Sequence, residues 1–105
     1  MQINRLDNLL KMLESQPNDA FLTYAVGLEY MNSENLPKAW EYFEQLLRSN
    51  PDYLPVYYQG ALLLIQMQQI EEAKALLFKG VDLAQQLGER KTLNELNDLL
   101  EQMED

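Results

Sequence analysis

The feature that most constrains the fold is a repeat in which Pro51 follows Pro17 by 34 residues. Similar residues recur at this spacing in one register along most of the chain. They are Leu13 and Leu47, Tyr24 and Tyr58, Leu28 and Leu62, Met31 and Ile65, Ala39 and Ala73, and Phe43 and Leu77. Because a single register links all of these pairs, two copies of one structural unit are predicted.

The first copy is predicted to be two helices joined by a tight turn, since its apolar residues recur every three or four positions. Asn18-Asp19 is expected to start the first of these helices, and Ser33 and Asn35 are expected to cap the second. Pro37 suits the first turn of that second helix. The helix should end at residues 49–51, because proline disfavours helix in the residue before it.

The second copy predicts helices over about residues 53–67 and 70–87, with Asp52-Tyr53 as the starting pair and Gly88 as a left-handed stop. Flanking helices are predicted from Ile3 to Ser15 and from Arg90 to about Met103. The expectation is an all-α fold of about six antiparallel helices in one domain, residues 1–105. Its parts are a half-repeat helix (1–16), repeat 1 (17–50), repeat 2 (51–84) and a capping helix (85–105). Met1 and the polar outer face of the last helix favour a complete chain.

The composition of the chain argues against several classes of catalytic site and binding partner. The chain has no cysteine and no histidine, which removes disulfides, cysteine nucleophiles, imidazole bases and most zinc sites. A net charge of −9 should repel nucleic acid and anionic membranes. The longest apolar run, residues 60–65, is too short to span a bilayer, and the first residues contain no export signal. We therefore expect a cytoplasmic protein that is not an enzyme and needs no metal or cofactor.

These residues resemble the tetratricopeptide repeat family, whose repeat is also 34 residues long. The first copy carries the resemblance in Gly27, Tyr30, Ala39, Phe43 and Pro51, although Thr23 stands where a large aromatic residue is usual. The second copy carries it in Tyr57, Ala61, Leu64, Ala73, Leu77 and Gly80. The resemblance implies a right-handed α-α superhelix that works as a scaffold or adaptor, in which the first helices of successive repeats line a concave peptide-binding groove.

The groove positions that this resemblance implies are mostly apolar or aromatic. They are Phe21, Tyr24, Leu28, Met31 and Asn32 in the first copy and Tyr58, Gln59, Leu62, Ile65 and Gln66 in the second. A subgroup of the family uses basic groove residues to bind the terminal carboxylate of heat-shock chaperones. No basic residue stands at the matching places here, which argues against that function.

Two other interpretations of the apolar groove residues remain open. The same stripe could be buried between identical chains, which would make the protein a homodimer or a larger structural assembly. The acidic composition also fits a small chaperone for a secreted or assembling partner protein. The sequence does not identify the partner.

Overall fold

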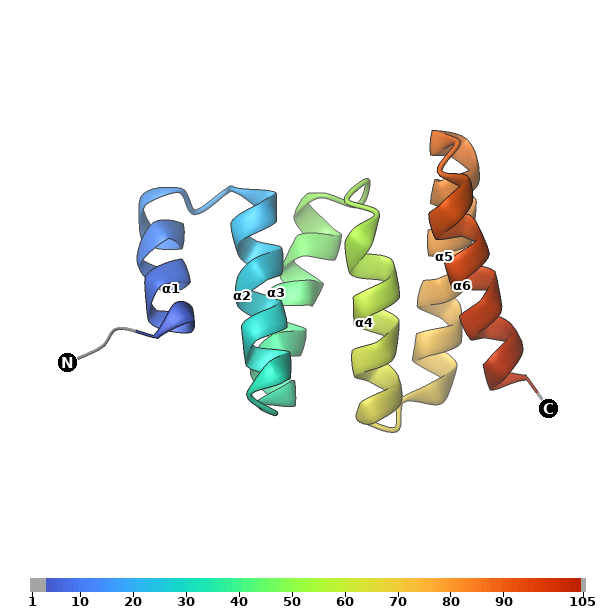
Figure 1. Cartoon of the computed structure of the whole chain (residues 1–105), viewed down its shortest axis with the longest axis horizontal. Coiled ribbons are helices and arrows are strands. Elements are labelled where there is room, and N and C mark those ends of the chain that lie inside the picture. The colour runs from blue at the N-terminus through green and yellow to red at the C-terminus, as the bar shows by residue number, and fades with distance from the viewer. Residues whose placement is uncertain (1–3, 105) are drawn as a thin grey trace. The chain divides into compact units, whose positions relative to one another are not determined.

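The computed structural model describes residues 4–104, and this part of the chain contains six α-helices and no strand. The helices are α1 (Arg5–Ser15), α2 (Ala20–Asn32), α3 (Leu36–Ser49), α4 (Pro55–Gln66), α5 (Ile70–Leu87) and α6 (Arg90–Met103). Figure 1 shows them in chain order. The predicted all-α helical fold is therefore confirmed. The expected helix start at Ile3 lies outside the described residues.

The chain divides into two compact units between Tyr53 and Leu54. In the first unit α1 packs on α2 and α2 packs on α3, whereas in the second unit α4 packs on α5 and α5 packs on α6. The predicted division into a half repeat, two repeats and a cap stays a prediction.

Burial follows the 34-residue register. Ala39 in α3 and Ala73 in α5 are both fully buried, and so are Phe43 and Leu77 one turn further on. Small residues at the first pair of positions let two helices approach closely, and large residues at the second pair fill the space beside them. Each helix pair therefore buries equivalent positions within its own unit.

The turns inside the two repeats also match. Glu34 and Gln68 stand at equivalent positions, and both have left-handed backbone, with φ of 61° and 62°. In each turn the following amide closes the preceding helix. Asn35 N donates to the Tyr30 carbonyl at 2.9 Å, and Gln69 N donates to the Leu64 carbonyl at 2.8 Å. Non-glycine residues rarely adopt this conformation. Here it allows the next amide to bond the end of the preceding helix.

Two predicted caps were wrong. Ser33 does not cap α3, because its hydroxyl donates to the Glu29 carbonyl and so closes α2. Asp52-Tyr53 does not start α4, which begins at Pro55 with Leu54 as a cap residue that makes no side-chain hydrogen bond. Proline has no N–H, so the first position of this helix needs no acceptor. The predicted stop at Gly88 is confirmed by its left-handed φ of 71°.

None of the helices among residues 4–104 combines the length and the apolar character that crossing a bilayer requires.

Candidate functional site

Helix α2 is held at its start by Asp19. The Asp19 carboxylate accepts a hydrogen bond from Leu22 N at 2.9 Å, and the Thr23 hydroxyl donates to the Asp19 carbonyl at the same distance. The first of these bonds satisfies an N–H group that a helix N-terminus otherwise leaves free. Along its length α2 packs on α3, where Gly27 lies directly against the ring of Phe43. The orientation of α2 about its own axis is therefore fixed within the first unit.

With α2 held in this way, one of its faces is only partly covered. We call this face the α2 stripe, and it consists of Phe21, Tyr24, Leu28, Met31 and Asn32. Phe21 is 63% exposed, Asn32 is also exposed, and the other three side chains are half-buried. The buried residues of the same helix, such as Leu22 and Val26, lie at other helical positions. The stripe is thus a separate surface from the helix face that forms the core.

Tyr24 lies at the centre of an aromatic cluster in the first unit. Its ring centroid is 5.9 Å from that of Phe43, with the two rings stacked, and 5.4 Å from that of Tyr53 at a tilt of 56°. Burial raises the pKa of Tyr24 above its ordinary value of 10.0, and the nearby Tyr53 raises it further. The phenol is therefore neutral at physiological pH and is held by packing.

In the second unit α4 presents an equivalent surface, the α4 stripe, made of Tyr58, Gln59, Leu62, Ile65 and Gln66. Gln66 is exposed and the other four are half-buried. The remaining positions of α4 are largely in the core, among them Val56 and Leu63, which are fully buried. Gly80 of α5 allows the close packing of this helix, because a Cβ there would lie 2.8 Å from Cβ of Tyr57.

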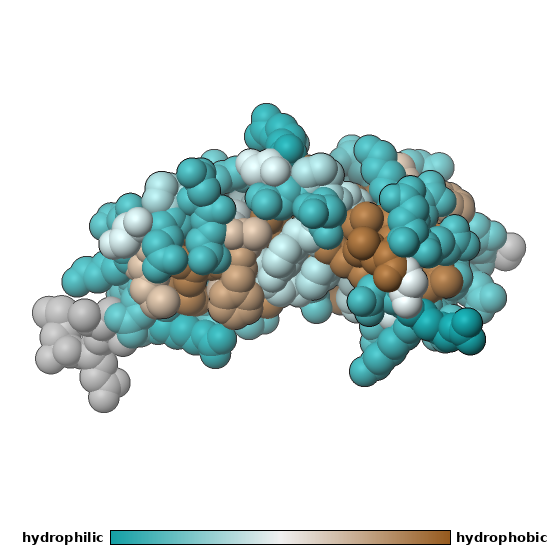
Figure 2. Space-filling model, turned by 90° about the horizontal axis from the view of Figure 1, so that it is seen from above, coloured by the Kyte–Doolittle hydropathy of each residue, from teal (hydrophilic) through white to brown (hydrophobic). Residues whose placement is uncertain are grey.

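The two stripes contain no charged residue, although charged residues make up 24% of the chain. The charges lie elsewhere. Arg5 of α1 pairs with Glu29 of α2 at 2.9 Å, and the pair between Lys38 and Glu41 lies within α3. Figure 2 shows one face of the molecule on which most residues are hydrophilic and the hydrophobic ones gather in patches.

The structure leaves all ten sequence-predicted groove residues incompletely buried and brings each set of five onto one helix. Their joining into a single groove stays a prediction. Sequence reasoning missed Tyr53, which contacts Tyr24 from the segment that follows α3. The sequence predicts Tyr53 at the start of the helix over about residues 53–67, whereas it lies in the segment between α3 and α4.

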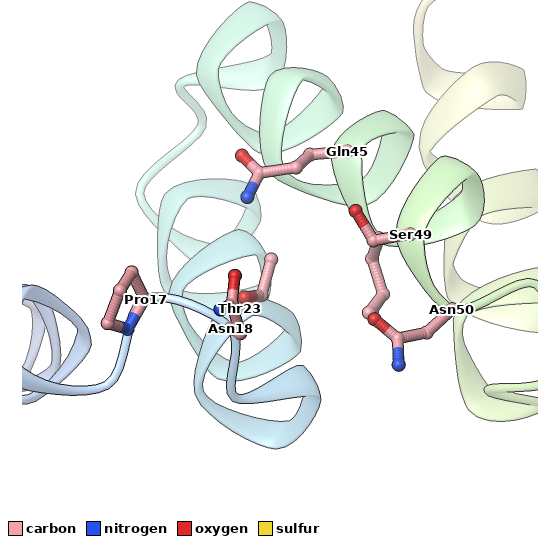
Figure 3. A pocket seen from close by; sticks show the side chains of 7 residues that line it. Pro17, Asn18, Thr23, Gln45, Ser49 and Asn50 are labelled. Carbon is pink, nitrogen blue, oxygen red and sulfur yellow. The ribbon is translucent and has the colours of Figure 1, made fainter.

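The structure also contains a pocket in each unit that the sequence did not indicate. One pocket, of about 250 Å³, lies between the start of α2 and the end of α3 and has a mainly polar lining (Figure 3). The other, of about 210 Å³, lies where α5 passes into α6 and is lined in part by Gln85, Gly88 and Arg90. Within residues 4–104 we find no group of three or more acidic residues that could hold a metal ion.

Residues 30–93 match the tetratricopeptide repeat family. The chain belongs to this family. It is similar to a tetratricopeptide repeat domain protein from Salinibacter ruber, whose solution structure is 31% identical. That match covers 84% of this chain and 89% of the other, with a TM-score of 0.80.

A protein from Bordetella parapertussis, 21% identical, has the same fold, with a TM-score of 0.84 over 98% of this chain and 89% of the other. An uncharacterized protein of Methanocaldococcus jannaschii is 32% identical over 65% of this chain and 79% of its own length.

Tetratricopeptide repeat proteins generally bind other proteins and are typically not enzymes. Membership of the family therefore indicates a protein–protein interaction module. The general function inferred from the sequence agrees with this class, whereas the partner and the surface that binds it are matters for proposal.

Proposed function

We propose that this tetratricopeptide repeat protein binds a segment of a partner protein through the α2 stripe, with the α4 stripe as a second contact surface. The observation that carries the proposal is the exposure of Phe21. Phe21 is 63% exposed at the start of an uncharged helix face. Exposure of a phenyl ring to water is unfavourable, so a partner that covers the ring gains binding free energy.

The rest of the α2 stripe supports the same function. Tyr24 is a rigid aromatic side chain, since it packs on Phe43 and Tyr53, and rigid aromatic residues give large contact areas at little entropic cost. Leu28 and Met31 continue the apolar surface, and Asn32 ends it with an amide. Such a face suits an amphipathic helix or an extended segment whose own apolar side chains are spaced to meet it.

Phe21→Ala is the sharpest test of the proposal, and Phe78→Ala is its matched control. Phe78 lies on α5, outside both stripes, and is 54% exposed, so both substitutions remove an exposed phenyl ring. We expect immobilised Phe21→Ala protein to lose partners that the parent protein and Phe78→Ala both retain. Once a partner is identified, the loss should be about 30-fold in affinity, as for a hot spot of about 2 kcal/mol.

A second variant, Tyr24→Ala combined with Tyr58→Ala, extends the test to the α4 stripe. Truncation of Tyr24 also removes its packing on Phe43, so circular dichroism must first show a native helix content. If this variant and Phe21→Ala both keep every partner of the parent protein while folded, the stripes are not the binding surface.

The alternative function is a homo-oligomer that buries the same stripes between identical chains. The exposed Phe21 favours it as well, because a second copy of the chain would equally remove the ring from water. Sedimentation equilibrium distinguishes the two functions. A monomer at high micromolar concentration contradicts self-assembly, whereas a dimer that Phe21→Ala dissociates and Phe78→Ala does not would support it.

A further inference from the structure

The polar pocket of the first unit lies where the start of α2 meets the end of α3. Thr23 and Leu46 form its buried part, with exposed fractions of 4% and 1%. Side chains that line its more open part come from the segment before α2 and from the last turns of α3, and Figure 3 shows them around one space. These residues are Pro17, Asn18, Gln45, Ser49 and Asn50.

The space exists because residue 23 is small. Thr23 is among the most buried residues of α2, and its hydroxyl is turned to the Asp19 carbonyl, to which it donates at 2.9 Å. An aromatic side chain at this position would extend several atoms further and fill the volume that the pocket now encloses. Asn18, Gln45 and Ser49 are exposed, so the recess of about 250 Å³ is open to solvent beside the buried Thr23.

The lining has a definite chemistry. In the part of the chain that the structure describes, the side-chain amides of Asn18, Gln45 and Asn50 make no hydrogen bond to protein, and neither does the Ser49 hydroxyl. Each amide offers two donor hydrogens and one acceptor oxygen. No lining residue is charged. The pocket therefore matches a neutral group that both donates and accepts hydrogen bonds.

Its size limits the ligand. Pockets for small organic ligands usually measure about 300 to 1,000 Å³, so one of about 250 Å³ suits a single side chain better. An ionised carboxylate would find no cation in the lining, within a chain of net charge −9. We propose that this pocket receives a carboxamide side chain, asparagine or glutamine, of a partner protein. The proposal rests on the proposed function in assuming that the ligand belongs to a protein.

The test uses three small probes added to the ¹⁵N-labelled full chain and followed by nuclear magnetic resonance. The probes are the N-acetyl methylamides of glutamine, glutamate and alanine. They share two backbone amides and differ in side chain. We expect the glutamine probe to shift the side-chain amide signals of Asn18, Gln45 and Asn50 saturably, in the millimolar range. The glutamate and alanine probes should bind at least tenfold more weakly.

Variants separate this site from the stripes. Thr23→Phe fills the pocket and should abolish the saturable shifts, whereas Thr92→Val on α6 is a control that should keep them. Gln45→Leu, at an exposed position, tests the lining without disturbing the buried residues and should weaken the glutamine probe at least threefold. Phe21→Ala should bind the glutamine probe like the parent protein, so failure of the stripe proposal and failure of the pocket proposal give different results.

Three results would overturn the proposal. The first is the absence of saturable shifts at the pocket with the glutamine probe. The second is that another probe binds as well as the glutamine probe does. Equal binding of the alanine probe would mean that the pocket responds to backbone amides. Equal binding of the glutamate probe would mean that it does not select a neutral group. The third is unchanged binding of the glutamine probe to folded Thr23→Phe or Gln45→Leu.

Discussion

The ring of Phe43 lies directly against the α-carbon of Gly27. A Cβ added at position 27 would lie 2.6 Å from Cδ1 of Phe43, whose side chain is fully buried. In the second repeat the equivalent residues are Ala61 and Leu77, both also fully buried. Repeat 1 therefore combines Gly27 with the large ring of Phe43. Repeat 2 combines the slightly larger Ala61 with the smaller side chain of Leu77.

This relationship predicts a compensated pair of substitutions. Gly27→Ala alone should lower the free energy of unfolding by roughly 1–3 kcal/mol, because it overpacks the contact with Phe43. Adding Phe43→Leu recreates the combination found in the second repeat and relieves the overlap. Urea denaturation of the parent, both single variants and the double variant should show that the double is more stable than the summed single effects imply. Additivity within about 0.5 kcal/mol would contradict this.

The cap of α2 predicts unequal effects for two aspartates. Asp19→Ala should lower the free energy of unfolding by about 0.5–2 kcal/mol, because it removes the acceptor of the Leu22 N–H group. Asp52→Ala removes the same charge from an exposed residue that caps no helix, and it should change stability by less than about 0.5 kcal/mol. Thermal or urea denaturation of both variants checks the difference, and equal losses would show that charge dominates over capping.

Because Glu34 has left-handed backbone, replacement of glutamate by glycine should have opposite effects on stability at position 34 and inside a helix. Glu34→Gly should raise the free energy of unfolding by up to about 1 kcal/mol, because glycine adopts a positive φ without steric cost. Glu95→Gly, at an exposed position inside α6, should lower it by about 1 kcal/mol through lost helix propensity. Both changes remove one negative charge. Destabilisation of similar size at both sites, measured by urea denaturation, would refute the conformational argument.

Three half-buried phenols predict a loss of stability at alkaline pH. Burial raises the pKa of Tyr24, Tyr42 and Tyr53 above the ordinary value of 10.0. As the pH rises, these groups lose their protons in the unfolded chain first, which favours unfolding. Their stabilising contribution is thus complete below about pH 10 and is lost as the pH rises through the folded-state pKa values. Denaturation at about pH 8 and pH 11 should show a smaller decline for Tyr24→Phe than for the parent protein. An unchanged decline would contradict the assignment to Tyr24.

Much of the fold could be predicted because its signals are local. The start and end of α5 and α6, and the left-handed stop at Gly88, follow from apolar periodicity and from the backbone freedom of glycine. The caps were harder to assign. Ser33 has a side chain that suits the start of a helix, yet its hydroxyl bonds the end of the preceding one. Residues of this kind have several possible backbone partners within reach, and only the path of the turn selects one.

The cytoplasmic location and the absence of a metal or cofactor stay predictions. That the two stripes join into one groove is also still a prediction. Each depends on something beyond the described chain: a cell, a ligand or a partner. The substitutions of Phe21 and Phe78 test whether a partner covers the α2 stripe, because the two rings lie on different helices and differ little in exposure.

The sequence by itself determined the helical units, their 34-residue register and the uncharged stripes, because helix periodicity, proline and glycine act over a few residues. Only the tertiary structure decided that Tyr53 packs on Tyr24 and that a recess opens beside Thr23. Both depend on side chains more than 20 residues apart in the chain, as Thr23 and Gln45 are. Contacts of that range follow from how helices pack, and no local pattern records them.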